Sequence, residues 1–335
     1  MKIEETQPFK EVMESLKNDP RVSIPLLYRF SDLSLEEWEY LREVWPTMDE
    51  ERRQVITRHL ADISEESFQV DFSDFFTLAL QDSYAPVRLA ALDGLWDSDK
   101  VTLIRPIIRM MQNDVDVDVR ARAAGSLGHY IVMGEWEMIS QKQTDPIVEA
   151  LLAQMDNPDT PLAVRRTALE SLGAAYHPRV PVLIADAYDS GRYDMQVSAV
   201  CAMGNSADKQ WVSIVVDEFE HPDAEMRFTA ARAAGQIGSS DMVQGLIELL
   251  EDDDLEVQQM AVASLGEIGG DVAREALEQL KEDPSAAELH EAVEEALEEL
   301  HLMTGIGSLS LIELGDDDFE DEEEDGNWLP FKGEA

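Results

Sequence analysis

The chain has 335 residues, 44% of them apolar and 29% charged, and its 71 acidic against 26 basic residues give a formal net charge of −45. An acidic surface repels the phosphate backbone that lysine and arginine normally bind, so the composition argues against a nucleic-acid partner. No apolar run approaches the ~20 residues that a membrane span needs, and the single cysteine, Cys201, excludes an intrachain disulfide or a thiolate metal cluster.

Residues 1–33 are predicted to form an N-terminal helical cap. The first five residues are polar and lack the apolar stretch of a secretory signal, so the cytoplasm is the expected location. Residues 8–16 indicate a helix that covers the first repeat. Ser34 is followed three residues later by Glu37, which is the capping-box pattern of a helix beginning at this point.

An internal repeat dominates the rest of the chain. It consists of an acidic turn followed by the phrase V-R-x-x-A-x-x-x-L-G, and successive copies begin 31 to 35 residues apart except for one step of 45. The valine, alanine and leucine of the phrase fall on one face of a helix. The closing glycine is expected to end that helix. The copies begin at Arg52, Val87, Val119, Val164, Met195, Met226, Val257 and Leu289.

A second apolar helix is predicted between consecutive phrases, so each repeat is a pair of helices, A and B. The fold class is therefore all-α, a solenoid of about eight helix pairs over residues 34–301. Small alanines inside the B helices allow neighbouring helices to approach to ~8–10 Å. The expected A helices lie at residues 75–80, 103–111, 146–155, 180–187, 212–219, 243–250 and 272–280.

Two segments depart from the repeat. The long step hides an insertion near residues 130–144 that contains Trp136, and repeat proteins often place such extra length on a binding face. After His301 the pattern stops, and residues 316–325 are almost wholly acidic. Such a composition cannot bury enough surface to fold alone, so residues 302–335 are expected to form a disordered acidic tail.

The repeat resembles HEAT repeats, in particular the bacterial phycobilisome-lyase-like group, whose turn of the type D-D-P-D precedes V-R and A-x-x-x-L-G. The phrases that carry the resemblance are residues 82–88, 221–235 and 252–266, and the similarity covers about residues 34–300. It implies the solenoid fold. It implies less about function, because such repeats occur in scaffolds, chaperones, lyases and one hydroxylase family.

The repeat arginines are interpreted as structural. In related repeats the arginine of the V-R pair usually binds the turn aspartate of a neighbouring repeat, and the resemblance implies the same role here. The arginines concerned are Arg88, Arg120, Arg165 and Arg227.

No metal site, cofactor or catalytic residue is predicted. Residues 114–118 imitate the start of a calcium loop, but Val119 and Gly125 occupy the places where an EF-hand needs glycine and glutamate. The HEAT-like deoxyhypusine hydroxylase resemblance would imply iron held by several His-Glu pairs, and only His290-Glu291 is present. Common phosphate-loop and hydrolase motifs are also missing from the sequence.

The predicted binding site is the concave face of the solenoid. If offsets 0, 4, 7 and 8 of each B helix are buried, offsets 2 and 6 face the groove. Apolar and basic side chains at these offsets suit an acidic and apolar peptide, although scattered exposed apolar residues need no explanation of their own. The predicted groove residues are Arg58, Leu89, Asp93, Arg166, Glu170, Val197, Phe228 and Arg232.

The function predicted is a scaffold, adaptor or assembly factor that binds a protein or peptide, without nucleic acid or membrane. The alternative is an enzyme or enzyme subunit related to phycobilin lyases or to deoxyhypusine hydroxylase. A further hypothesis concerns the tail. Its acidic residues and Trp328 have the charge opposite to the arginine-rich B helices, so the tail is a candidate occupant of its own groove; otherwise it only increases solubility.

Overall fold

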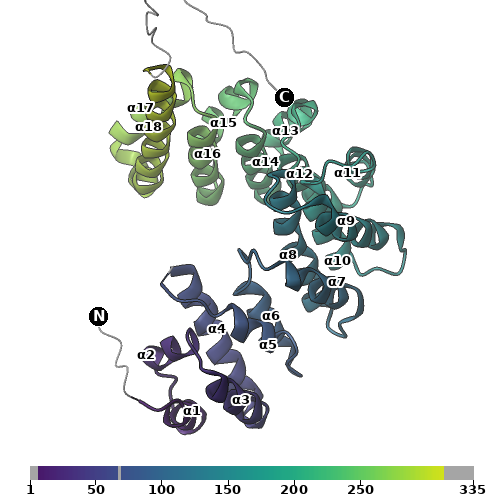
Figure 1. Ribbon diagram of the computed structural model, residues 1–335. Coiled ribbons are helices and arrows are strands. Elements are labelled where there is room, and N and C mark those ends of the chain that lie inside the picture. Colours follow the sequence, from purple (N-terminus) through teal and green to yellow (C-terminus); the bar gives the residue numbers. More distant parts are fainter. Residues whose placement is uncertain (1–6, 67–68, 313–335) are drawn as a thin grey trace, which may run out of the picture.

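The computed structural model describes residues 7–66 and 69–312, with side chains described as far as Leu302. These residues form eighteen α-helices joined by turns and short 3-10 segments, without a β-strand. The predicted all-α solenoid of eight helix pairs is confirmed (Figure 1). None of the described helices combines the length and apolar character needed to cross a bilayer. The predicted tail falls mainly on residues 313–335, which lie outside the described part.

Two short helices, α1 (Phe9–Asn18) and α2 (Ile24–Leu27), precede the pairs, and α1 packs on α3. The A helices are α3 (Leu35–Val44), α5 (Ser73–Ala79), α7 (Ile104–Asn113), α9 (Gln141–Asp156), α11 (Val180–Tyr188), α13 (Val212–Asp217), α15 (Val243–Glu248) and α17 (Asp271–Glu282). The B helices are α4 (Glu50–Glu66), α6 (Ala85–Asp93), α8 (Val117–Glu135), α10 (Leu162–Gly173), α12 (Tyr193–Asn205), α14 (Ala224–Ile237), α16 (Leu255–Ile268) and α18 (His290–Ile312).

Acidic and hydroxyl side chains set where several helices begin. Ser34 and Glu37 form the predicted capping box at the start of α3, each binding the other's backbone N–H. Asp116 caps α8, and Asp223 and Asp254 cap α14 and α16 in the same way. A cap satisfies an N–H group that has no partner inside the helix and places negative charge at the positive end of its dipole. The acidic turns are therefore helix starts.

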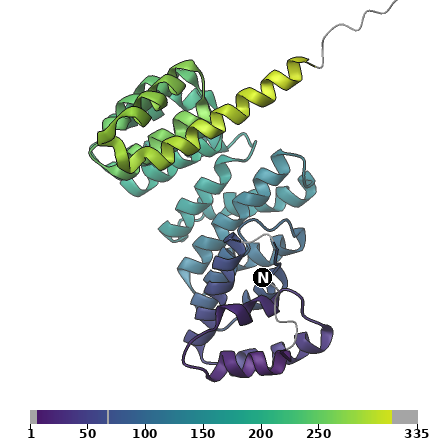
Figure 2. The same ribbon diagram turned by 90° about the vertical axis from the view of Figure 1, so that its left-hand side faces the viewer.

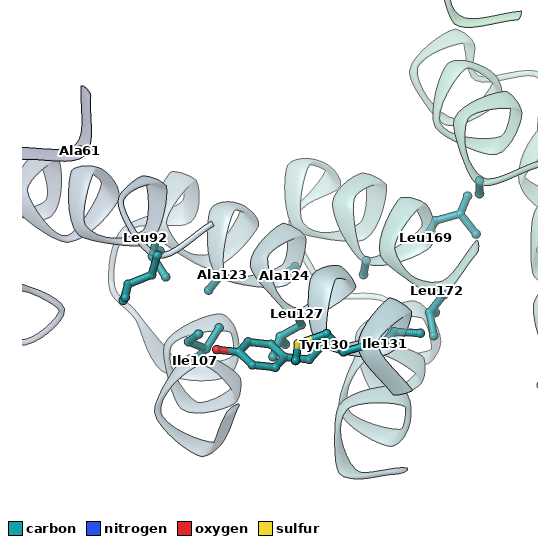
Figure 3. Packing of buried hydrophobic residues seen from close by; sticks show 14 of the residues in the cluster. Ala61, Leu92, Ile107, Ala123, Ala124, Leu127, Tyr130, Ile131, Leu169 and Leu172 are labelled. Atoms are coloured by element: carbon teal, nitrogen blue, oxygen red, sulfur yellow. The ribbon is translucent and has the colours of Figure 1, made fainter. Parts of the chain in front are cut away.

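The core lies between the layer of A helices and the layer of B helices. The phrase residues at offsets 0, 4 and 8 are buried, as the spacing predicts; in α8 these are Val119, Ala123 and Leu127, all fully buried. Figure 3 shows Leu127 and Tyr130 of α8 beneath the B helices, with the Tyr130 ring directed toward Ile107 of α7. Each repeat thus buries its apolar face against its own A helix and its neighbours.

The glycine that closes the phrase was expected to end the helix, but it does so only at Gly173, the last residue of α10. Gly128, Gly204, Gly235 and Gly266 lie inside α8, α12, α14 and α16, and each meets the next B helix. A Cβ added at Gly204 would lie 2.7 Å from the Cα of Ala233. Because these residues have no side chain, the backbones of adjacent B helices touch.

Close B-helix contacts give the solenoid its curvature. Successive B helices pack directly on one another, whereas successive A helices touch less. The closely spaced layer is the inside of a curve, so the B helices line the concave face and the A helices the convex face of the crescent (Figure 1). In the repeat of α6 the glycine is replaced by Trp96, which is 56% exposed, and α6 packs less extensively on α8 than most B helices do on their neighbours.

The insertion and the C-terminal boundary differ from expectation. Residues 130–144 do not form a separate loop: α8 continues to Glu135, α9 begins at Gln141, and Tyr130 is buried. The extra length therefore extends two helices and leaves a short turn between them. At the other end, α18 continues to Ile312, beyond the predicted end of the solenoid at His301, and projects past its neighbours (Figure 2).

Replacing Ala207 with glycine is expected to raise the free energy of unfolding by about 0.5–1 kcal/mol. Ala207 has a φ of 49°, a left-handed conformation that glycine adopts without strain, and the equivalent positions of the next two repeats are Gly238 and Gly269, with φ of 67° and 70°. Urea unfolding followed by circular dichroism measures the change. Ser206→Gly is the control, because Ser206 has a φ of −76° and gains nothing from glycine.

Candidate functional site

Three repeat arginines join consecutive repeats. Each makes two hydrogen bonds to an aspartate in the turn before the next B helix, with nitrogen–oxygen distances of 2.6–2.9 Å. Both side chains of each pair are at most 12% exposed. Each pair joins a B helix to the turn before the next B helix, and its role is structural. They are Arg53–Asp82, Arg88–Asp114 and Arg227–Asp252.

Arg120 and Arg165 do not make the expected ion pair with a turn aspartate. Arg120 donates to the carbonyl of Met111 at 3.0 Å, and Arg165 to the carbonyl of Asn157 at 3.0 Å. The reason lies in the following turns. Where Asp82, Asp114 and Asp252 accept the N–H two residues ahead, the turns facing Arg120 and Arg165 use the uncharged side chains of Asn157 and Ser190.

The N-terminal half of the groove carries a charge cluster of two arginines around one aspartate. Nη1 of Arg58 lies 2.7 Å from Oδ2 of Asp93, and Nη1 of Arg122 lies 2.9 Å from its Oδ1. The two arginines are 50% and 56% exposed, and Asp93 is 13% exposed. The predicted groove residue Arg58 therefore lies at the surface, but much of its charge is neutralised within the protein.

The middle of the groove holds the other predicted polar residues. Arg166 donates through Nε to the Ser198 hydroxyl at 3.0 Å, and that hydroxyl donates to Glu170 at 2.5 Å. Nη2 of Arg232 lies 2.8 Å from the sulfur of Cys201. Arg166 and Glu170 lie on α10 and Arg232 lies on α14, and each contacts a side chain of the helix between them, α12. Arg166 and Arg232 therefore each already have a contact within the protein.

The predicted apolar groove residues are less accessible than expected. Val197 is only 6% exposed, so its placement in the groove was wrong: α12 is packed between α10 and α14, and nine of its 13 residues are buried. Leu89 and Phe228 are partly buried and pack against the core. The concave face therefore offers a much smaller apolar floor than the sequence indicated.

Cys201 is expected to react slowly with thiol reagents in the folded protein. Burial raises its pKa to about 11, nearby Glu170 acts in the same direction, and Arg232 only partly opposes them. Since the thiolate is the reactive form, modification by an aromatic disulfide reagent at pH 8 should be at least ~100-fold slower than in denaturant. Equal rates in the two states would contradict this environment for the thiol.

A hollow of about 1060 Å³ lies where the C-terminal ends of α8, α10, α12 and α14 meet the following turns. Its floor includes Gly125, Gly128, Gly173 and Gly204, so the close contacts between B helices also explain why the surface is recessed. Cys201, Glu170 and Arg232 contribute to its wall. Of the predicted groove residues, Glu170 of α10 and Arg232 of α14 line this hollow.

A second hollow of about 780 Å³ adjoins the first, and both are lined by Glu135, Tyr176 and His177. Three large apolar side chains stand at this boundary: Trp136 is 73% exposed, Met138 63% and Tyr176 96%. The backbone N–H of Tyr176 donates to Glu135 at 3.1 Å, which holds the turn after α10 against the end of α8. We call Trp136, Met138 and Tyr176 the aromatic ridge.

Sequence reasoning singled out Trp136 through the long repeat step but missed Tyr176 and Met138. The missed signal was an aromatic residue placed directly after the helical phrase, where the pattern requires nothing apolar. Among the described residues no group of three histidine, cysteine or carboxylate side chains could hold a metal ion. His290 of the His-Glu pair contacts the carbonyl of Asp283 at the start of α18.

Comparison with known proteins gives the family. A family model described as HEAT repeats matches residues 180–256 and 212–298. Residues 180–298 are HEAT repeats. The narrower phycobilisome-lyase-like resemblance is not confirmed, and no curated protein sequence matches.

Several solved structures are similar to this chain. An engineered protein is 19% identical over 88% of each chain, with a TM-score of 0.39. YibA of E. coli is 17% identical, covering 72% of this chain and 95% of its own, with a TM-score of 0.40. Human deoxyhypusine hydroxylase in complex with glycerol is 16% identical over 87% and 98%, with a TM-score of 0.36. Such scores support no inference about activity.

Proposed function

We propose that this HEAT-repeat solenoid is a scaffold or adaptor that binds a protein segment at the two hollows beside the C-terminal ends of α8 and α10. The observation that carries the proposal is the aromatic ridge. Trp136, Met138 and Tyr176 expose most of their surface at one place, although the solenoid does not need them for its own packing. Exposed aromatic side chains beside a recess are typical of residues that anchor a partner.

The experiment compares binding by the wild-type chain and by the double variant Trp136→Ser/Tyr176→Ser. The protein is first purified from its native host, and copurifying proteins are identified by mass spectrometry. The affinity of the recombinant full chain for the identified partner is then measured by calorimetry. We expect the double variant to bind at least ~10-fold more weakly, because aromatic anchors contribute a large share of the affinity of such interfaces.

Trp96→Ser is the matched control for this experiment. Trp96 is 56% exposed and lines neither hollow, so its removal should leave the affinity unchanged. Equal affinities of the wild-type chain and the double variant would refute the proposed surface. If the native protein instead carries iron or a bound tetrapyrrole, the alternative function as an enzyme or enzyme subunit is favoured.

A further inference from the structure

The two hollows have an uncompensated negative charge. Their linings contain six carboxylates and no lysine, and their single arginine is Arg232, whose guanidinium faces Cys201. The side chains of Glu137, Asp145 and Glu149 all lie in the second hollow and are exposed. The six carboxylates are those of Glu135, Glu137, Asp145, Glu149, Glu170 and Asp208.

Among the described residues, none of the six has a lysine, arginine or histidine nitrogen within 4.0 Å. The contacts they do make are with uncharged groups: Glu135 accepts the Tyr176 N–H, Glu170 the Ser198 hydroxyl and Asp208 the Gln210 amide groups. This contrasts with Asp93 of α6, which lies between two arginines.

The aromatic ridge also favours a positively charged ligand. An ammonium or guanidinium group is attracted to the face of a tryptophan or tyrosine ring, and the attraction adds to that of a nearby carboxylate. Trp136 directly follows Glu135 in the chain, and Tyr176 is tied to Glu135 by its N–H. A lysine or arginine side chain at the ridge would thus meet both kinds of group at once.

Three buried polar atoms of the first hollow lack a partner among the described residues: the indole nitrogen of Trp211, Nε2 of His129 and Nε of Arg232. Trp211 is 6% exposed and lines this hollow, and its indole N–H has no acceptor among the described residues. Nε2 of His129, another lining residue, is likewise unpaired. Unsatisfied buried polar groups are costly. Small side-chain movements would let the backbone carbonyls of an entering peptide supply the acceptor that Trp211 needs.

From these observations we infer that the paired hollows bind a basic segment of a partner protein, with a lysine or arginine side chain at the aromatic ridge. This inference rests on the proposed function and names the chemistry of the partner. It replaces the acidic, apolar peptide that the sequence suggested. The acidic C-terminal residues of the chain are a poor occupant for the same reason: residues 315–335 contain ten carboxylates and one lysine.

The test uses fluorescein-labelled 12-residue peptides of alternating lysine and glycine, and of alternating glutamate and glycine, with the full chain. Fluorescence anisotropy at 50 mM and 150 mM salt measures their affinities. The lysine peptide is expected to bind and the glutamate peptide not. In the variant Glu135→Gln/Glu149→Gln, lysine-peptide affinity should fall about tenfold, because two carboxylates that face the peptide are lost. The glutamine amide at position 135 can still accept the Tyr176 N–H.

A matched control variant distinguishes direct contact with the hollows from attraction by the overall negative charge of the protein. Glu278→Gln/Glu282→Gln removes the same charge from exposed positions of α17, far along the chain from the hollows, and should change the affinity less than twofold. Trp136→Ser/Tyr176→Ser should also weaken binding of the lysine peptide, and Trp96→Ser should not. Equal losses in the two glutamine variants, or tighter binding of the glutamate peptide, would overturn the inference.

The two proposals can fail separately. If a native partner is lost in Trp136→Ser/Tyr176→Ser but is unaffected by Glu135→Gln/Glu149→Gln, the ridge is a binding surface and the inference of a basic partner is wrong. If the lysine peptide binds as described but no native partner depends on the ridge, the hollows recognise basic segments and the scaffold function at this surface is refuted.

Discussion

Replacing Gly173 with alanine is expected to lower the free energy of unfolding by about 2–3 kcal/mol. A Cβ at this position would lie 2.5 Å from the carbonyl oxygen of Ala202 and 2.9 Å from its Cα, both of them backbone atoms that cannot rotate away. The helices α10 and α12 would have to separate, and the resulting loss of packing exceeds the gain of ~1 kcal/mol in helix propensity when alanine replaces glycine.

Gly125→Ala is the matched control for this prediction. Gly125 lies inside α8 on the concave face, and an added Cβ would meet only a methyl group of Thr167 at 3.8 Å. Its substitution should therefore raise stability by up to ~1 kcal/mol. Thermal and urea unfolding of both variants, followed by circular dichroism, gives the comparison. Equal stability of the two variants would show that adjacent B helices can separate without cost.

The fold could be predicted because the spacing of apolar residues within each short segment determines it. Val119, Ala123 and Leu127 fall on one helical face by spacing alone, and the same spacing recurs in every repeat. The role of the glycine could not be read in this way. Near the end of a helical pattern glycine usually marks a C-cap, and only the neighbouring helix, which the sequence does not place, shows that Gly204 and Gly235 are contact points.

The groove was harder to predict because exposure depends on two neighbouring helices and not on one. Helical phase places Val197 on the concave side, yet the small residues of α10, α12 and α14 bring these helices so close that its side chain is covered. Ion pairs in the groove were hard to predict for the same reason. Arg58 and Asp93 were both predicted to face the groove, but their ion pair depends on the distance between α4 and α6.

The aromatic ridge carries almost no signal of its own in the sequence. Trp136 could be singled out because it lies in the unusually long interval between two repeats. Tyr176 lies in the turn after its helix, where no periodicity applies. The hydrogen bond between Glu135 and the Tyr176 N–H joins two turns that are 41 residues apart. Such a pairing is a property of the stacked repeats, so the site could be found only from the structure.

Replacing Arg53 with methionine is expected to lower the free energy of unfolding by about 3–5 kcal/mol. Arg53 is 6% and Asp82 3% exposed, and the guanidinium makes two hydrogen bonds of 2.8 and 2.9 Å to the carboxylate. Methionine retains much of the apolar volume but leaves a buried negative charge without its counterion. Urea unfolding at neutral pH measures the loss.

The control is Arg58→Met on the same helix. Arg58 is 50% exposed and its ion pair with Asp93 is largely solvated, so the expected loss is below about 1 kcal/mol. If both variants lose the same amount of stability, burial does not decide the importance of these pairs.

The dependence of the Arg53→Met effect on pH identifies its cause. Burial opposes ionisation of Asp82, but hydrogen bonds from Arg53, from the Tyr84 N–H and from the Trp45 indole outweigh it and lower the carboxyl pKa below its ordinary value of 3.8. This stabilisation is complete above the unfolded pKa and is lost as pH falls through the lower folded pKa. In the variant, burial should dominate and raise the pKa of Asp82, so protonation relieves the buried charge. The stability difference between wild type and variant is therefore expected to be largest near pH 7 and to shrink steadily toward pH 3. A difference independent of pH would mean that methionine disrupts packing rather than the ion pair.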